Sequence, residues 1–531
     1  MTQPARAAGS RPLFARQQRI PPLVILLPSL VVAAATLLPI IYLVLRASGA
    51  AGGIWEYMLR PRTLAVLGNT LLLVGSVSGA SLCIALPVAW LTSRTDLPGR
   101  RLWFVLTTLP LVIPSYVGAY AYVSAFAPGG LVSGLLGVGP PVYGFWGALM
   151  VLTLFTYPYL LLTLRAGFRG IDPSLEEASR SLGLSPWKTF FKVTLPLLRP
   201  SIAVGSLLVA LYVLSDFGAV SMLRYSTFTR AIYIQYENSF NRSNAAVLAL
   251  MLVALAALLL LIDAQLRGRG RIQRTGVGEA QRTAKQSLGR WRFPAMLFLG
   301  ATVLVALLGP LTIITFWFGR GLVGAQRFSF DWLAIVNAAG VSLLAALVAV
   351  VFSVPVAVLV VRFPSRLSAV LERLTYVGYA LPGIVVALAL VFFGVRYLPW
   401  LYQSLAMLVV AYVLLFLPQA VGNLRATLLQ TNPHVEEAAR SLGRSPGRVL
   451  LEVTLPLLRS GLVTSAMLVF LTTMKELPAT LLLRPTGFDT LATRVWSWTE
   501  EAFFAQAAPY AILLVLVSSF SLGILLAQDR K

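Results

Sequence analysis

Cysteine and histidine are almost absent from this chain, with one of each among 531 residues. A single cysteine excludes a disulfide framework, and one cysteine with one histidine cannot form a Cys/His metal cluster. Cys83 lies inside an apolar run, where we expect it to be packed, and His434 lies in a polar loop, where we expect a surface residue without a metal role. The sequence therefore predicts no metal site of high affinity.

Charged residues are also scarce, at 12% of the chain against 58% hydrophobic residues. That balance is not the composition of a soluble globular protein. The charges lie in short clusters between apolar runs, and each run can supply the ~20 residues that a helix needs to cross the hydrocarbon core. We predict an all-α polytopic membrane protein with about twelve transmembrane helices. The expected helices are 21–46, 64–93, 102–126, 142–166, 197–222 and 243–266, then 293–318, 333–361, 369–394, 401–425, 457–482 and 505–527.

Acidic residues are outnumbered, with 19 Asp and Glu against 43 Lys and Arg, for a net charge of +24. Such an excess can indicate nucleic-acid binding, but no basic domain lies outside the apolar runs, so we expect none. The arginines gather in segment 1–20, in a glycine-containing linker at 267–292 and in short loops that all fall on one side of the membrane. The positive-inside rule makes that side cytoplasmic, with both termini on it. The linker separates a first repeat (21–266) from a second (293–531).

One polar segment occurs twice, 260 residues apart. DPSLEEASRSLGLSPWKTFFKVTLPLLRP fills 172–200, and NPHVEEAARSLGRSPGRVLLEVTLPLLRS fills 432–460. Each copy lies between the fourth and fifth expected helices of its half, on the basic side. The same offset pairs Asp216 with Glu476 and Arg224 with Arg484. Six helices of the same orientation in each half predict two parallel repeats related by an axis along the membrane normal, with a pathway between them.

Each copy of the segment is predicted to form two short helices at the membrane face. Asp172 and Asn432 are good N-cap residues, each followed by a proline at the first helical position. Gly183 and Gly443 suit a left-handed helix end, and the Ser-Pro pairs that follow restart a second helix. The carboxylates of the early turns suit the positive end of the helix dipole; they are Glu176, Glu177, Glu436 and Glu437.

Two further positions and one alternative complete this interpretation. Pro196 and Pro456 are expected to interrupt the backbone before the next span. The alternative is an amphipathic hairpin that merely connects two membrane helices.

The pattern Glu177-Ala178-Ser179-x3-Gly183-x9-Val193-x-Leu195-Pro196 resembles the EAA loop of binding-protein-dependent ABC importer permeases, and 437–456 repeats it. The departures are mild, a serine for the second alanine and a valine for the usual isoleucine. The resemblance covers nearly the whole chain and implies a type I importer-like fold. It also implies that each loop is a coupling helix that docks into a groove on a cytoplasmic ATPase. The coupling residues so implied are Glu177, Ala178, Gly183, Pro196, Glu437, Ala438, Gly443 and Pro456.

That resemblance implies alternating access, with two copies of an ATPase subunit below and a substrate-binding protein outside a bacterial inner membrane. The chain has no G-x-x-x-x-G-K-[ST] phosphate loop. We therefore expect a non-catalytic membrane subunit that binds no cofactor, while a separate ATPase uses ATP. Segments 215–233 and 474–496 are similar to the ferric-iron branch of fused permeases. Thiamine permeases share the layout, and thiamine, a phosphonate or a polyamine stays open as the substrate.

Two acids are predicted to lie within the outer half of the membrane. Asp216 and Glu476 are ~27–30 Å along their helices at 1.5 Å per residue, near the outer face. An intramembrane carboxylate suggests function, so with Arg224 and Arg484 they are candidate residues of the translocation path. A hard cation such as Fe³⁺ prefers oxygen donors, which neighbouring tyrosines could add: Tyr116, Tyr120, Tyr122, Tyr212 and Tyr225. Alternatively, each acid pairs with its own arginine or caps a helix end.

A rival class is a gradient-driven secondary transporter with parallel repeats. It would need a relay of acids and histidines near the bilayer centre. Both acids here are expected near one end, with no histidine in an apolar run. The sequence disfavours this class.

Overall fold

The computed structural model describes residues 21–49, 53–137, 139, 142–238, 242–267, 286–323 and 330–528. Within these ranges, nine helices are long and apolar enough to cross a membrane, and two bent helix pairs raise the number to eleven. A further apolar helix, Phe504–Phe520, is shorter over its described part. These segments correspond to the twelve that the sequence predicted. Segment 1–20 and most of the predicted linker lie outside the described residues.

The first half contains helices α1 to α13, and two of its turns are wound differently. The helices are α1 (Leu23–Ala47), α2 (Ile54–Met58), α3 (Pro61–Arg94), α4 (Arg100–Thr108), the 3-10 turn η1 (Leu109–Val112), α5 (Ser115–Phe126), α6 (Leu131–Leu136), α7 (Phe145–Gly170), α8 (Pro173–Ser181), α9 (Pro186–Thr189), the π-turn η2 (Phe190–Thr194), α10 (Leu195–Ser215), α11 (Gly218–Met222), α12 (Phe228–Asn238) and α13 (Ser243–Arg267).

The second half repeats this order. Its elements are the 3-10 turn η3 (Gly289–Trp291), α14 (Arg292–Val303), the π-turn η4 (Leu304–Leu308), α15 (Gly309–Val323), α16 (Trp332–Arg362), α17 (Arg366–Ala380), α18 (Gly383–Tyr397), α19 (Leu405–Gln430), α20 (Pro433–Ser441), α21 (Pro446–Val449), the π-turn η5 (Leu450–Thr454), α22 (Leu455–Leu457), α23 (Arg459–Met474), α24 (Pro478–Leu483), α25 (Leu491–Glu500) and α26 (Phe504–Gln528).

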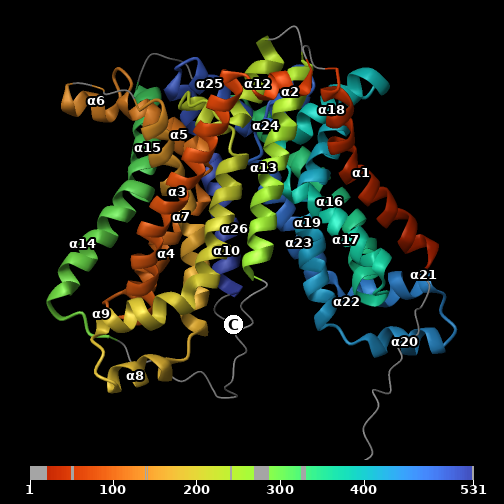
Figure 1. Cartoon of the computed structure of the whole chain (residues 1–531). Helices are drawn as coiled ribbons and strands as arrows, with labels where there is room; N and C mark the ends of the chain where they lie inside the picture. The colour runs from red at the N-terminus through yellow and green to blue at the C-terminus, as the bar shows by residue number, and fades with distance from the viewer. Residues whose placement is uncertain are drawn as a thin grey trace, which may run out of the picture.

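The two repeats exchange their first membrane helices. Helix α1 packs against α16, α17 and α18 of the second repeat, as well as against α13 of its own. Correspondingly, α14 packs against α4, and α15 packs against α5 and against α26. Figure 1 shows α1 along the flank of the second repeat and α14 along the flank of the first. Each side of the helix bundle therefore contains helices from both sequence repeats.

Prolines break the third membrane helix of each repeat. The chain is non-helical at Ile113 and Pro114 before α5, and again at Leu381 and Pro382 before α18. A proline lacks a backbone N–H and disfavours helical geometry in the residue before it, so a break at each Ile/Leu-Pro pair is expected. The fifth membrane helices also stop early, α10 at Ser215 and α23 at Met474. These interruptions place irregular backbone inside the bundle.

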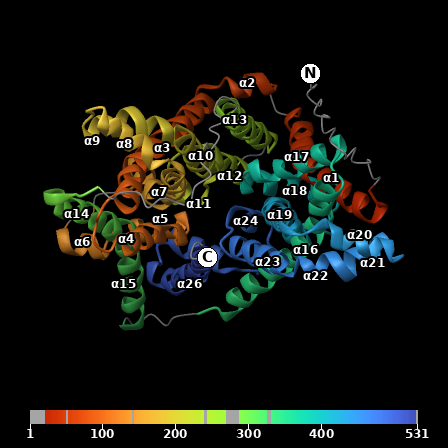
Figure 2. The same cartoon turned by 90° about the horizontal axis from the view of Figure 1, so that it is seen from below.

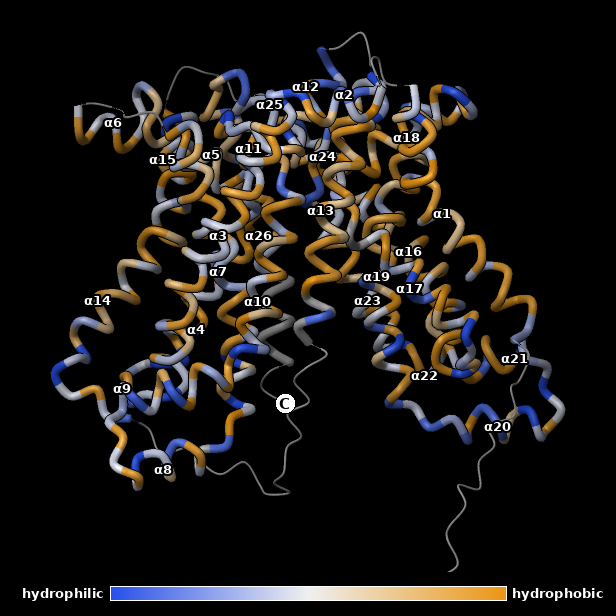
Figure 3. Tube along the Cα trace, viewed as in Figure 1, coloured by the Kyte–Doolittle hydropathy of each residue, from blue (hydrophilic) through white to orange (hydrophobic). Residues whose placement is uncertain are grey.

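The molecule has two distinct ends. Helices α8, α9, α20 and α21 lie at one end, in two separate groups (Figures 1 and 2). Helices α11, α12, α24 and α25 lie together at the other end (Figure 3). From there the two sides of the molecule splay apart towards the repeated loops (Figure 1). Figure 3 shows hydrophobic residues along the spans and hydrophilic residues at both ends. Cys83 is exposed on α3 rather than packed, because no other element covers that face of the helix.

The last residues of the predicted linker are attached to the first repeat. Gln286 forms a parallel bridge with Thr95, and the Gln286 N–H donates to the Arg94 carbonyl at 2.9 Å. Asp96 accepts from the Leu288 N–H at 3.0 Å and pairs with Arg292. These contacts attach the described end of the predicted linker, from residue 286, to the α3–α4 loop beside the start of α14.

Candidate functional site

The two repeated loops form the helix pairs that the sequence predicted. The Asp172 side chain accepts from the Ser174 N–H at 2.9 Å, and Asn432 accepts from the His434 N–H at 3.0 Å. Each first helix, α8 or α20, ends before a left-handed glycine, with φ of 84° at Gly183. The second helices begin at the predicted Ser-Pro pairs. Capping and turn chemistry are local, which is why the sequence was sufficient here.

The prediction for Pro196 and Pro456 was wrong in detail. In the first half, α9, η2 and α10 run on as one helical span through Pro196. In the second half the interruption comes after Pro456, where the helix that ends at Leu457 and α23 are bent by 74°. A π-turn precedes each proline, and this widened turn relieves the clash of the proline ring with the preceding turn.

The loops present an exposed, partly apolar face away from the membrane helices. Glu177, Ala178, Ala438 and the two glycines Gly183 and Gly443 are exposed, and Glu437 is half-buried.

Two leucines at equivalent places in the repeat are among the most exposed large side chains: Leu182 and Leu442 each keep 84% of their surface accessible. Exposed leucines on a polar loop outside the apolar spans are typical of a protein-docking surface. Sequence reasoning overlooked both, although the repeat of Ser-Leu-Gly in two polar loops was the available signal.

The glutamates that directly precede Glu177 and Glu437 are buried instead. Glu176 is 6% exposed, accepts from the Thr194 hydroxyl at 3.0 Å, and has the guanidinium of Arg94 at 3.8 Å. Arg94, the last residue of α3, also donates to the Phe168 carbonyl at 2.8 Å. The contact attaches α8 to the base of the second membrane helix.

The second half has the same attachment in a tighter form. Arg362, the last residue of α16, donates through Nε to both carboxylate oxygens of Glu436 at 3.1 and 3.2 Å. Its Nη2 donates to the Thr431 hydroxyl at 2.8 Å, and Arg440 approaches Glu436 at 3.7 Å. We call these two contacts, Arg94 with Glu176 and Arg362 with Glu436, the clamp pairs. A buried ion pair holds two elements in one geometry, because separating the partners leaves a charge without compensation.

Asp216 caps a short helix at the opposite end of the first repeat. Its Oδ1 accepts from the N–H groups of Ala219 at 3.0 Å and Val220 at 3.3 Å, at the start of α11. Its Oδ2 accepts from the Ser115 hydroxyl, directly after the proline break that precedes α5. The carboxylate thereby joins α10, α11 and α5 at their interrupted ends.

Glu476 occupies the equivalent place in the second repeat. It accepts from the Ala479 N–H at 2.9 Å and from the N–H and hydroxyl of Thr480 at 3.1 and 2.9 Å. A Cβ on Gly383, the first residue of α18, would meet the Glu476 carboxylate at 2.8 Å, so the acid lies against that helix start. The sequence left open whether each acid lines a path, pairs with the arginine of its own repeat or caps a helix end. In the structure both acids cap a helix start.

The tyrosines proposed as oxygen donors are mostly engaged with backbone carbonyls. Tyr116 donates to the Lys475 carbonyl at 3.3 Å, Tyr120 to that of Phe504 at 2.8 Å, and Tyr122 to that of Val305. These three contacts join α5 to the second repeat. Tyr225 donates to the Asn69 carbonyl at 3.3 Å, and the ring of Tyr212 packs on Tyr159. The hydroxyls of Tyr116, Tyr120 and Tyr122 therefore brace the contact between the two sequence repeats.

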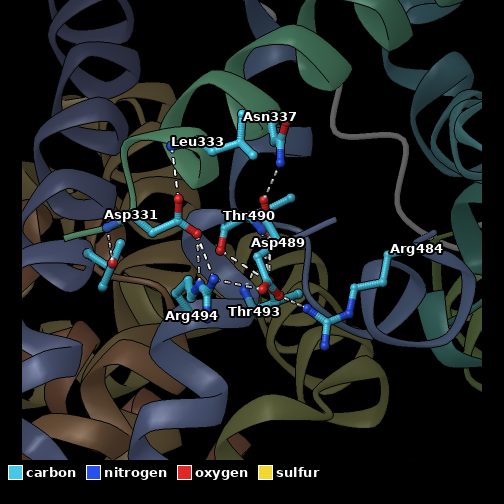
Figure 4. A network of polar contacts seen from close by, with 9 residues as sticks. Asp331, Leu333, Asn337, Arg484, Asp489, Thr490, Thr493 and Arg494 are labelled. Atoms are coloured by element: carbon cyan, nitrogen blue, oxygen red, sulfur yellow. Dashed lines mark hydrogen bonds and ion pairs between the residues drawn. The ribbon is translucent and has the colours of Figure 1, made fainter. Parts of the chain in front are cut away.

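Arg484 does not pair with Glu476. It pairs with Asp489 in the network of Figure 4, where Arg494 contacts Asp489 at 3.0 Å and Asp331 at 2.6 Å. Asp331 also caps the start of α16 through the Leu333 N–H at 3.0 Å. The network thus joins α16 to the loop after α24.

Arg224 does not pair with its own acid either. Its guanidinium lies over the ring of Tyr143, 4.8 Å from the centroid, and its backbone is left-handed with φ of 57°. Among the four residues expected along a path, the structure therefore brings the two acids to helix breaks and places the two arginines elsewhere at the end opposite the repeated loops.

Comparison with known proteins places this geometry in a family. Residues 81–269 and 349–531 both match the family described as binding-protein-dependent transport system inner membrane component. The chain is 35% identical to the Fe(3+)-transport system permease protein FbpB 2 of Haemophilus influenzae, over 96% of this chain and 98% of that protein.

Two further relatives show the range of transport systems. The ferric transport system permease protein FbpB of Actinobacillus pleuropneumoniae is 24% identical over 85% of this chain and 69% of its own. The molybdenum transport system permease protein ModB of Escherichia coli is 32% identical over 37% of this chain and 91% of its own length. The two family matches, one in each half and each with its coupling loop, decide the assignment: the chain is a fused member of the inner membrane components of binding-protein-dependent transport systems.

Proposed function

We propose that this chain is the permease of an ATP-driven importer that moves ferric ion from an extracytoplasmic binding protein into the cytoplasm. The observation that carries the proposal is the pair of coupling loops at one end of the molecule, each with an exposed leucine and a clamp pair. The family description supports the dependence on a binding protein. The name of the Haemophilus influenzae relative supports ferric ion.

One ATPase subunit docks on each coupling loop, two copies in all, and the permease itself binds no nucleotide. Leu182 and Leu442 enter apolar pockets on the ATPase, while Glu177 and Glu437 contribute charged contacts at the rim. The clamp pairs then pass the displacement of α8 and α20 to the ends of α3 and α16. Because a buried ion pair resists separation, the loop and its helix move as one body.

The end that carries the coupling loops is cytoplasmic. Support comes from the arginines at the ends of α3 and α16 and in the coupling loops, as the positive-inside rule expects. The described chain begins with α1 and finishes with α26 at this end (Figure 1), which agrees with two cytoplasmic termini in a bacterial inner membrane.

Closure of the ATPase dimer brings the coupling loops together and rocks the two halves about their contact at the outer end. Asp216 and Glu476 act there as braces that keep α11 and α24 in place while the halves move. Their carboxylates accept hydrogen bonds from backbone N–H groups and hydroxyls, as in helix capping.

Uptake by the reconstituted complex tests the proposal. Proteoliposomes holding the chain and its ATPase, supplied with the binding protein of the same system, should accumulate ferric ion only with ATP inside. Molybdate is the second candidate, because the molybdenum permease ModB is 32% identical to part of this chain. Uptake of molybdate without uptake of ferric ion would overturn the ferric assignment, and ATP-independent uptake would overturn the importer itself.

A further inference from the structure

Each half carries two arginines in the segment that follows its fifth membrane helix: Arg224 and Arg230 in the first half, Arg484 and Arg494 in the second. Arg224 and Arg484 are equivalent at the 260-residue offset, whereas Arg494 lies four residues beyond the position equivalent to Arg230. The backbone beside each pair is held in the same way, since Asn69 donates to the Ser226 carbonyl at 3.3 Å and Asn337 donates to the Asp489 carbonyl at 3.1 Å. The scaffold is therefore shared. The charge balance is not.

In the second half the arginines are neutralised. Both belong to the ion-pair network of Figure 4, which supplies the carboxylates of Asp331 and Asp489. That network joins three elements, which are the start of α16, the loop that follows α24, and α25. These arginines therefore stabilise the internal structure of the second half.

In the first half the two arginines lack acidic partners among the described residues. Across the described ranges, no carboxylate lies within ion-pair distance of Arg224 or Arg230. Arg230 donates to the Ser226 hydroxyl at 3.2 Å, and Arg224 lies over the ring of Tyr143. Both partners are neutral, so two positive charges remain at this place.

The arrangement is unfavourable for the isolated chain. Burial lowers the pKa of Arg230, and the nearby charge of Arg224 lowers it further. Arg224 is exposed and holds the left-handed conformation that follows a helix end, where glycine is preferred. Two like charges and an unfavourable backbone geometry at an exposed loop indicate that these residues interact with another molecule.

We infer that Arg224 and Arg230 form a docking site for an acidic patch on one lobe of the substrate-binding protein. Arg224 follows α11 and Arg230 lies in α12, and both helices lie at the end opposite the coupling loops (Figure 3), the side from which a soluble binding protein approaches. The inference rests on the proposed function in that it needs such a protein. It adds an orientation: the acidic lobe lies over the first half, because the two arginines of the second half are already paired with acids.

Binding of the ferric-loaded binding protein to the full permease–ATPase complex in nanodiscs tests this. The variant Arg224→Gly with Arg230→Gln removes both charges, and glycine suits the left-handed backbone, so the fold is kept. Arg484→Gln is the matched control, since that charge is neutralised within the chain. Thermal midpoints of all three complexes confirm that each is folded.

We expect the double variant to lower the association rate about tenfold at low salt, to flatten its salt dependence, and to change the dissociation rate little. Arg484→Gln should lower the thermal midpoint but leave association unchanged. Equal association by the double variant and the wild type would overturn the inference, as would equal loss in Arg484→Gln or normal association with impaired uptake. If the ferric-loaded protein failed to bind the wild-type complex, the proposed function would fall instead.

Discussion

Arg362 and Glu436 are joined by two hydrogen bonds from one guanidinium nitrogen, whereas their counterparts Arg94 and Glu176 lie 3.8 Å apart. The same residue types at the same places in two repeats thus form a tight contact in one half and a loose one in the other. The two coupling loops are therefore held with different strength, although the sequence of the repeat is nearly the same.

The tight clamp pair should matter more for coupling. Arg362→Gln leaves Glu436 buried with only Arg440 at 3.7 Å, and breaking a buried pair costs about 3–5 kcal/mol. We expect the thermal midpoint to fall strongly. We also expect the complex to hydrolyse ATP without taking up substrate. Arg94→Gln is the matched control and should cost less, because Glu176 keeps the Thr194 hydroxyl.

Adding Glu436→Gln to Arg362→Gln should restore part of the stability, since the unpaired charge is removed. Equal damage by Arg94→Gln and Arg362→Gln would contradict the difference between the two clamp pairs.

The exposed leucines should carry docking of the ATPase. Leu182→Ala with Leu442→Ala shortens two side chains that are each 84% exposed, so the thermal midpoint of the permease should change little. Buried interface anchors are worth about 2 kcal/mol or more each, so co-purification of the ATPase should fall at least tenfold. Leu135→Ala, an equally exposed leucine on α6, is the control and should leave co-purification intact. Retention of the ATPase by the double variant would place docking elsewhere.

Neutralising the two capping acids should have unequal effects. In Asp216→Asn the amide oxygen can still accept from the N–H groups of Ala219 and Val220, and the Ser115 hydroxyl can turn to accept from the new NH₂ group, so uptake should stay near that of the wild type. In Glu476 each carboxylate oxygen accepts from a backbone N–H, which cannot turn, so the NH₂ group of Glu476→Gln faces a donor. The free energy of unfolding should therefore fall by roughly 1–2 kcal/mol, and uptake should fall severalfold. Alanine at either position removes the cap and should destabilise the complex by about 1 kcal/mol. Equal abolition of uptake in Asn and Gln variants that remain folded would show that the charges themselves meet the cation.

Acid should loosen the first coupling helix before the second. The Ser174 N–H holds the pKa of Asp172 below its ordinary value, so the folded helix binds the proton less readily than the unfolded chain does. This stabilisation is present above the ordinary aspartate pKa of about 3.9 and is lost as the pH falls through the lower, folded value. Asn432 caps the second helix and does not titrate. A ¹⁹F label on α8 should report acid fraying that a label on α20 lacks. Asp172→Asn should abolish the difference, and fraying that persists in that variant would point to another group.

The sequence by itself determined the apolar membrane spans, the twofold repeat and the helical form of the two repeated loops. Apolar runs, N-caps such as Asp172 and left-handed glycines such as Gly183 act through residues close to them in the chain, so their consequences can be predicted from the sequence. The family assignment followed from the same local motifs.

Only the tertiary structure decided which neighbouring residue does what. Glu176 and Glu177 are adjacent and chemically alike, yet one is buried against Arg94 and the other is exposed. Likewise Arg224 and Arg484 occupy equivalent positions, and only the second has an acidic partner, Asp489, in a network that also includes Asp331 from a remote segment. The exchange of α1 and α14 between the halves is also a matter of packing between remote segments. Burial and pairing depend on groups brought together from different helices, and no pattern within one helix specifies them.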